Sequence, residues 1–194
     1  FSADMINGFC KEGNLASPRI DALSKPIADF FVEAHAFGIT DFALIQESHH
    51  AEAHEFKSFP PHGIKGTAEA ETIPELAELP FFHDFEVFLK NALTPAFSPS
   101  FQDYLQMRKF KLAIVVGNCT DLCVRELAMC LRMWANEYHQ DLRVVVVADL
   151  VETFDLPFDV AKDLGLMPHP GDFYHRFVLY EMARNGIEVV SEVL

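Results

Sequence analysis

The stretch Ile114-Val-Val-Gly-Asn-Cys-Thr-Asp-Leu-Cys-Val124 joins a strand pattern to the start of a helix. Its apolar opening is typical of a buried parallel strand, which Gly117 and Asn118 then end. Thr120 or Asp121 can cap the helix that follows. The apolar face of that helix is predicted to contain Leu127, Cys130, Leu131 and Trp134.

Cys123 is predicted to lie in the first turn of this helix, a position that suits a nucleophilic thiol. Unpaired backbone N–H groups and the positive end of the helix dipole favour a thiolate there and can hold an oxyanion. The alternative is a buried structural thiol, which is how Cys10 and Cys130 are interpreted. A disulfide or a thiolate zinc site is disfavoured, because the chain is not small and has no paired Cys-x-x-Cys.

Length, composition and charge narrow the class of protein. The 194 residues suit one domain, and the hydrophobic half of them is enough for a sizeable core. A formal net charge of -14 with only 15 Lys and Arg argues against a nucleic-acid surface and favours a small-molecule or protein partner. The sequence has no apolar run of about 18 residues and no basic, apolar leader at its start, so we expect no membrane partner and a cytoplasmic location.

Strand-like and helix-length segments alternate along the chain. The predicted strands, besides a short first one before Asp4, are Ile39 to Gln46, Phe85 to Leu89, Leu112 to Val116, Val144 to Ala148 and Ile187 to Val193. The predicted helices are Pro18 to Ala36, Phe101 to Met107, Asp121 to Tyr138 and Asp172 to Arg184. This order predicts a single α/β domain over residues 1–194, with a three-layer, doubly wound (Rossmann-like), mostly parallel six-stranded sheet and helices on both faces.

Reactive side chains follow several of these strands. In an open parallel sheet, chemistry gathers beyond the carboxyl ends of the strands. Asp4 follows the first strand, Glu47 and His49 the second, Lys90 the third, and Cys119 to Cys123 the fourth. Taken singly, Asp4 is explained as a turn residue and Lys90 as a solvated strand end. Together they predict a site where Asp4 takes the thiol proton and Lys90 stabilises the anions.

The long segment from residue 48 to residue 79 is predicted to be a metal and substrate loop, since loops of this length are usually functional or disordered. Glu47-x-His49 with Glu55 and His62 offers two imidazoles and two carboxylates, a set suited to zinc, iron or manganese. His54 competes with Glu55 as the third ligand. Five further histidines are interpreted as solvated: His50, His83, His139, His169 and His175.

Four motifs resemble the nicotinamidases within the isochorismatase-like cysteine hydrolases, over nearly the whole chain. They are Asp4-Met-Ile-Asn-Gly-Phe9, Glu47-Ser-His49 leading to Phe59-Pro-Pro-His62-Gly-Ile-Lys-Gly-Thr67, Lys90 with Phe97, and Gly117-Asn-Cys-Thr-Asp-Leu-Cys123-Val. The resemblance implies a parallel sheet flanked by helices and hydrolysis through a thioester. It also implies that Asp4, Lys90 and Cys123 are the catalytic residues.

The resemblance further implies a divalent metal beside the nucleophile, zinc foremost and iron or manganese as alternatives. Its ligands would be Glu47, His49, Glu55 and His62, with Glu55 preferred to His54 because it stands seven residues before His62. Glu47 departs from the family pattern, which has Asp at this position. Aromatic walls around the substrate would be Phe9, Phe59 and Phe97. A cis peptide between Asn118 and Cys119 would turn the Cys119 and Cys123 N–H groups towards one oxyanion.

These expectations combine into hydrolysis of nicotinamide to nicotinic acid and ammonia. The alternative within enzymes is a metal-free relative that acts on another amide, a carbamoyl compound or an isochorismate-like ether. The alternative outside enzymes is a non-catalytic scaffold in which Cys123 is only a buried thiol. Because family members are often dimers or larger, a homo-oligomer is expected.

Overall fold

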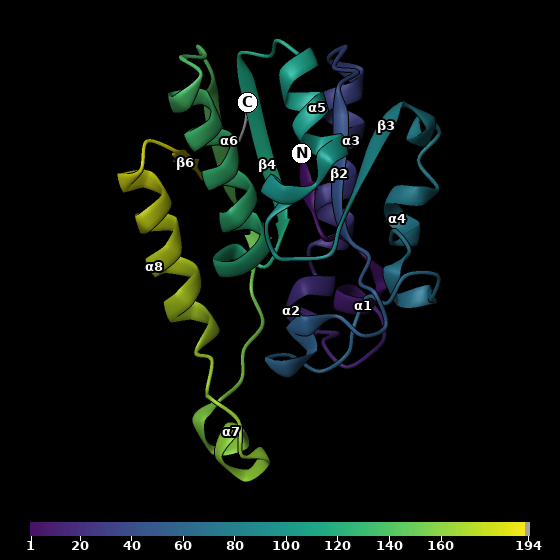
Figure 1. Ribbon diagram of the computed structural model, residues 1–194, viewed down its shortest axis with the longest axis vertical. Helices are drawn as coiled ribbons and strands as arrows, with labels where there is room; N and C mark the ends of the chain where they lie inside the picture. The colour runs from purple at the N-terminus through teal and green to yellow at the C-terminus, as the bar shows by residue number, and fades with distance from the viewer. Residues whose placement is uncertain (193–194) are drawn as a thin grey trace.

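The computed structural model describes residues 1–192, and its centre is a six-stranded sheet in which every strand pair is parallel (Figure 1). The strand order is β3-β2-β1-β4-β5-β6. The strands are β1 (Ser2–Ala3), β2 (Phe42–Glu47), β3 (Phe85–Lys90), β4 (Leu112–Asn118), β5 (Arg143–Glu152) and β6 (Glu188–Val190). The predicted parallel sheet is therefore confirmed, although β6 is shorter than predicted and Val193 lies outside the described residues.

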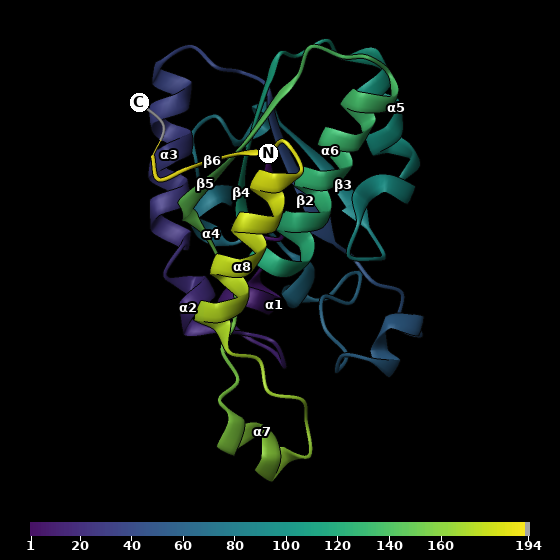
Figure 2. The ribbon, with the colours of Figure 1, turned by 90° about the vertical axis from the view of Figure 1, so that its left-hand side faces the viewer.

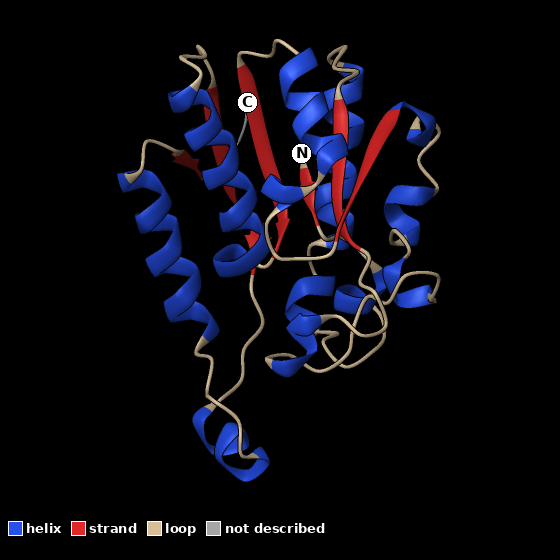
Figure 3. Cartoon of the chain, viewed as in Figure 1, coloured by secondary structure: helices blue, strands red, loops and turns tan. Residues whose placement is uncertain are grey.

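Helices cover both faces of the sheet (Figures 2 and 3). They are α1 (Asn7–Cys10), α2 (Pro18–Asp21), α3 (Ser24–Ala36), α4 (Pro74–Ala77), α5 (Pro99–Met107), α6 (Arg125–Glu137), α7 (Phe158–Leu164) and α8 (Gly171–Arg184). Within residues 1–192, no helix is both long enough and apolar enough to cross a membrane.

Two hydrophobic cores lie on opposite faces of the sheet, as the two-residue repeat of the strands requires. On β2, Ala43 and Ile45 pack into the core shared with α5, α6 and α8, while Phe42 and Leu44 pack into the core shared with α1 to α4. Successive residues are thus buried on both sides, which explains why these strands read as continuous apolar runs.

Two predicted helices differ from the structure. The segment from Pro18 to Ala36 forms two helices, α2 and α3, with a break between them. The helix predicted from Asp121 starts regularly only at Arg125, after an irregular helical turn (η5, Thr120–Val124) in which Leu122 has φ -117° and ψ -105°. Cys123 therefore lies just before α6 rather than in its first turn.

The strand order reverses between β1 and β4, because the chain builds β2 and β3 on one side of β1 and β5 and β6 on the other. Ligands bind outside the carboxyl ends of the strands at such a switch point. Gly117 makes the close approach of β4 to β1 possible: its φ is +114°, and a Cβ there would stand 2.2 Å from the carbonyl oxygen of Ala3. Only glycine fits at this position.

Candidate active site

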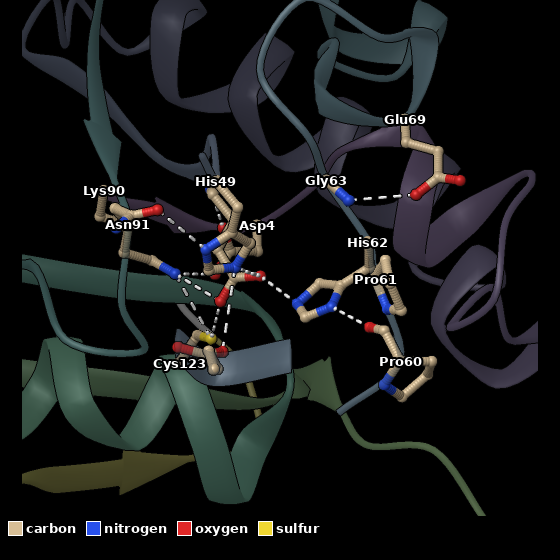
Figure 4. Close-up of polar contacts among 12 residues, drawn as sticks. Asp4, His49, Pro60, Pro61, His62, Gly63, Glu69, Lys90, Asn91 and Cys123 are labelled. Atoms are coloured by element: carbon tan, nitrogen blue, oxygen red, sulfur yellow. Dashed lines mark hydrogen bonds and ion pairs between the residues drawn. The ribbon is translucent and has the colours of Figure 1, made fainter. Parts of the chain in front are cut away.

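Four buried side chains meet beyond the carboxyl ends of four neighbouring strands, and Figure 4 labels three of them, Asp4, Lys90 and Cys123. Asp4 follows β1 in a left-handed conformation with φ 49°, which few residues other than glycine adopt. Glu47 ends β2 and Lys90 ends β3, as paired neighbours in the sheet register. Cys123 comes from η5 beyond β4. The structure therefore brings together Asp4, Lys90 and Cys123, although Asp4 and Cys123 are 119 residues apart in the sequence.

The Lys90 ammonium lies at the centre of this group. Its Nζ is 2.8 Å from Oδ2 of Asp4 and 2.9 Å from Oε1 of Glu47, and it donates to the Cys123 sulfur at 3.5 Å. Burial lowers the pKa of Lys90, but the negative charges of Asp4 and Glu47 outweigh burial and raise it well above its ordinary value. Lys90 therefore keeps its positive charge and does not act as a general acid.

The thiol of Cys123 is protonated at rest. Burial raises its pKa well above the ordinary value, Lys90 lowers it, and the carboxylates of Asp4 and Glu47 raise it further. This direction disagrees with the expectation of a resting thiolate, because burial and nearby negative charges favour the neutral thiol. A base must remove the proton during attack.

Glu47 connects the nucleophile to a second group of polar residues through its two oxygens. Oε1 contacts Lys90 and accepts a hydrogen bond from the Cys123 sulfur at 3.4 Å. Oε2 lies 3.0 Å from Nε2 of His62 and 3.2 Å from Nε2 of His49. Burial raises the pKa of Glu47, but Lys90 and the two imidazoles outweigh it and hold that pKa well below its ordinary range.

The second group consists of Glu47, His49, Glu55 and His62, whose potential ligand atoms all lie within 4.8 Å of one another. His54, the competing candidate, is exposed and outside this group. Two buried atoms of the group, Nε2 of His49 and Oε1 of Glu55, have no hydrogen-bond partner among the described residues. Unpaired buried polar atoms are costly, and a cation would satisfy both.

The two histidines are oriented from behind, as metal-binding histidines usually are. Nδ1 of His62 donates to the carbonyl oxygen of Pro60 at 2.8 Å, and Nδ1 of His49 lies 3.3 Å from Oδ1 of Asn91 (Figure 4). In both rings this leaves Nε2 facing the centre of the group. Two imidazoles and two carboxylates form a ligand set suited to a divalent metal such as zinc.

Asp4, Glu47 and Cys123 also place ligand atoms within 4.8 Å of one another. Lys90 already supplies the positive charge at that point, because its ammonium contacts all three side chains. A second cation there would be repelled at close range. The four-residue group is therefore the better metal site.

Backbone pairing brings the loop residues to the sheet. His49 and Ile64 form an isolated parallel bridge, with His49 N donating to Gly63 O at 2.9 Å and Lys65 N donating to His49 O at 2.9 Å. This pairing places His62 beside Glu47, the last residue of β2. The predicted loop from residue 48 to residue 79 is thus partly ordered, and contains the short turns η1 (His54–Lys57) and η2 (Ala68–Ala70) as well as α4.

A narrow cavity of about 20 Å³ reaches the nucleophile and the metal-ligand group. Its lining residues are Phe9, Leu15, Glu47, Glu55, Phe59, His62, Leu93, Asn118, Cys119, Leu122 and Cys123. Phe9 and Phe59 therefore lie where an aromatic ligand would contact them. Phe97 does not: its side chain is 80% exposed and lines a separate groove between α5 and α6, because the turn η4 (Pro95–Phe97) directs it outward. Leu93 lines the cavity instead.

The turn that carries the nucleophile is held by its backbone and by side-chain contacts. The peptide between Asn118 and Cys119 is cis, which confirms the expectation from the resemblance, and Asn118 Nδ2 donates to the carbonyl oxygen of Asp4 at 2.7 Å. Nε2 of His169 lies 2.8 Å from Oδ2 of Asp121, and Thr120 Oγ1 lies 2.9 Å from Nδ1 of His175. Neither histidine belongs to a sequence motif, and each lies far along the chain from its partner, so the sequence alone did not reveal these contacts.

Comparison with known proteins assigns this arrangement to a family. A model of the isochorismatase domain matches residues 1–190. Nicotinamidase 1 of Arabidopsis thaliana is 32% identical over 208 residues, covering 98% of this chain and 84% of that protein. The chain therefore belongs to the isochorismatase family. Within the family it is a nicotinamidase-like cysteine hydrolase.

Solved structures with the same fold act on different compounds. The pyrazinamidase of Pyrococcus horikoshii in complex with zinc has a TM-score of 0.75 at 19% identity, covering 98% of this chain and 97% of that chain. The N-carbamoylsarcosine amidase of Thermoplasma acidophilum has a TM-score of 0.68 at 21% identity, covering 100% and 95%. At these identities the likeness concerns the fold, and substrate choice rests on the site.

Proposed function

We propose that this enzyme hydrolyses nicotinamide to nicotinic acid and ammonia through a thioester on Cys123. The observation that carries the proposal is the meeting of the Cys123 thiol, the Lys90 ammonium and the Asp4 carboxylate beside a group of metal-ligand residues. The 32% identity to Nicotinamidase 1 across 98% of the chain supports the choice of amide.

Asp4 is the better of two candidate bases. The thiol donates to Glu47, and a carboxylate oxygen of Asp4 lies within 4.8 Å of the sulfur. Burial raises the pKa of Asp4 to about 6, against the opposing charge of Lys90, whereas the pKa of Glu47 is held well below its ordinary range. A general base works best when its pKa is near the working pH, so Asp4 accepts the proton and Glu47 does not.

The reaction begins with the substrate carboxamide carbon over the Cys123 sulfur. As Asp4 takes the thiol proton, a C–S bond forms, and the N–H groups of Cys119 and Cys123 are assigned to the resulting oxyanion. The proton passes from Asp4 to the leaving nitrogen, and ammonia departs as the C–N bond breaks. Water deprotonated by Asp4 then attacks the thioester, which releases nicotinic acid and the Cys123 thiol. Lys90 stabilises the anions throughout.

Glu47, His49, Glu55 and His62 would hold a divalent metal, zinc first among the candidates. A metal bound there would supply a Lewis acid for the pyridine nitrogen of the substrate. Phe9 and Phe59 would contact the faces of the ring and exclude water from the cavity. Four cysteines, all free, support a reducing compartment and hence a cytoplasmic enzyme.

A second candidate is the hydrolysis of a carbamoyl compound, favoured by the structural likeness to N-carbamoylsarcosine amidase. The two substrates differ in what they offer a metal, because only nicotinamide carries a ring nitrogen. Ammonia release from nicotinamide and from N-carbamoylsarcosine, before and after chelation, separates them. A chelator-sensitive rate on nicotinamide supports the first candidate.

The central test replaces the nucleophile. Cys123→Ala should lower ammonia release from nicotinamide on the order of 10⁴-fold or more, as loss of a nucleophile does in other hydrolases. Its metal content should stay unchanged, since the sulfur is not among the four proposed ligands. Cys130→Ala, which removes a partly buried thiol away from the site, is the matched control and should retain activity. Full turnover by Cys123→Ala would refute the assignment.

A further inference from the structure

The turn Pro60-Pro-His-Gly63 carries the ligand candidate His62, and a side chain from outside the turn holds its backbone. Pro60 and Pro61 have no N–H group, so the backbone donors of the turn are those of His62 and Gly63. The Gly63 N–H donates to Oε2 of Glu69 at 3.0 Å (Figure 4). Glu69 therefore binds one of the two donors that the turn possesses.

Gly63 is connected to both histidines of the ligand group. It directly follows His62 in the chain, and its carbonyl oxygen accepts a hydrogen bond from the backbone N–H of His49 at 2.9 Å. The same residue is thus contacted by Glu69 at its N–H and by His49 at its C=O. A displacement of Gly63 would move the two imidazoles relative to each other.

The carboxylate of Glu69 occupies space that two glycines leave open. A Cβ at Gly13 would stand 2.6 Å from Cδ and from Oε1 of Glu69, and a Cβ at Gly8 would stand 3.1 Å from the Cβ of Glu69. Glycine at both positions lets the half-buried Glu69 side chain pack directly against the backbone of this segment. The carboxylate is therefore confined on one side while it binds Gly63.

The backbone on either side of Glu69 is also held. Asn7, the first residue of α1, donates through its N–H to the carbonyl oxygen of Glu71 at 2.9 Å and through Nδ2 to the carbonyl oxygen of Ala68 at 3.1 Å. A supporting side chain whose own backbone and packing are fixed keeps the group that it binds in one geometry. Glu69 meets this requirement.

We propose that Glu69 is a positioning residue of the metal site, which holds His62 in place through the N–H of Gly63. The inference rests on the proposed metal-assisted function. Glu69 itself lies outside the four-residue ligand group, so it acts through the turn and not on the metal. A hydrogen bond from a backbone N–H to a carboxylate is stronger than one between neutral groups, which suits this role.

Zinc binding by the metal-free protein, measured in competition with a chromogenic chelator, tests the proposal. Glu69→Ala should weaken binding about 10- to 100-fold, as loss of a supporting residue behind the ligands does in other metal sites. Glu69→Gln keeps an oxygen that can accept from Gly63 and should bind with intermediate affinity, because a neutral hydrogen bond is about half as strong. The exposed Glu71→Ala removes the same charge nearby and should bind zinc as the wild type does.

Gly13→Ala disturbs the same contact from the other side. The added Cβ would push the carboxylate of Glu69 from its place, so this variant should also weaken zinc binding. Its effect on zinc affinity should vanish in the Glu69→Ala background, which a double-mutant cycle measures. Circular dichroism and thermal unfolding of the metal-free variants identify any that fail to fold.

Unchanged zinc affinity in a folded Glu69→Ala variant would overturn the positioning role and leave the proposed metal site standing. Glu69→Gln binding no better than Glu69→Ala would also overturn it, because charge rather than the hydrogen bond would then be responsible. Wild-type protein that binds no zinc would contradict the zinc site itself, and the role of Glu69 would fall with it.

Discussion

The two halves of the active site are built differently. Asp4 follows β1, Lys90 ends β3 and Cys123 lies in the turn after β4; we call these three the nucleophile half. Lys90 already supplies a positive charge beside the carboxylates. His49, Glu55 and His62 come from the loop after β2, and two of their buried atoms, Nε2 of His49 and Oε1 of Glu55, make no hydrogen bond among residues 1–192. The nucleophile half contains its own cation, Lys90, whereas the loop half, which these three residues form, contains no lysine or arginine. Glu47 belongs to both.

This difference indicates which half depends on the metal. A group whose charges balance internally keeps its geometry without a ligand, because each side chain is already held. A group with unpaired buried atoms gains stability when a cation binds, since binding removes their desolvation cost. Substitutions in the two halves should therefore differ in their effect on metal content as well as on rate.

The largest effect after loss of the nucleophile is expected for Asp4→Asn. Removing a general base should lower kcat on the order of 10² to 10⁴-fold with metal content unchanged. The base must be ionised, so the wild-type rate should fall as pH drops through about 6, the pKa of Asp4. Profiles of kcat/KM against pH test this, and Asp4→Asn should lack the acidic limb.

Glu47→Gln is the discriminating companion in that experiment. It should keep an acidic limb displaced to lower pH, because the negative charge of Glu47 raises the pKa of Asp4. A limb that disappears in Glu47→Gln and survives in Asp4→Asn would make Glu47 the base.

An intermediate effect is expected for His62→Ala, which acts on the loop half alone. The variant should lose most of its bound metal, and its melting temperature should no longer respond to chelator. Wild-type protein should be destabilised by chelation, by about 2.7 kcal/mol where free metal had stood at 100 times its dissociation constant. Metal analysis and thermal unfolding measure both, with the exposed His83→Ala as control. Unchanged metal content in His62→Ala would contradict the ligand assignment.

The smallest effect concerns how the nucleophile half is held. Burial lowers the pKa of His169, but the hydrogen bond to Asp121 has the larger effect and raises the pKa of His169 above 6.5. Burial raises the pKa of Asp121, but the hydrogen bond to His169 has the larger effect and lowers the pKa of Asp121 below 3.8. The His169 contribution is full below pH 6.5 and is lost as pH rises through the higher folded pKa. The Asp121 contribution is present above pH 3.8 and is lost as pH falls through the lower folded pKa.

His169→Asn should therefore destabilise the protein by about 1 kcal/mol between roughly pH 4 and 6.5, and by less at alkaline pH. Urea unfolding at pH 5.5 and 8.5 measures the difference, with the exposed His139→Asn as control. An equal loss of unfolding free energy at both pH values would show that the charge of His169 contributes nothing.

The meeting of Asp4, Lys90 and Cys123 could be predicted because the topology of a parallel sheet decides where strand ends converge. Asp4, Glu47 and Lys90 end neighbouring strands, so strand recognition alone brings them together. The protonation of Cys123 could not be predicted, since its pKa depends on burial and on charges from other strands. Phe97 was misplaced because a short turn sets its direction. His169 was missed because it lies 48 residues from Asp121.

The cavity beside Cys123 is smaller than the molecule it is proposed to receive. Its volume of about 20 Å³ has room for about one water, far less than a pyridine ring. A ring can be received there only when lining side chains such as Phe59 and Leu93 move aside, so the proposed reaction includes an opening of this wall before the chemistry.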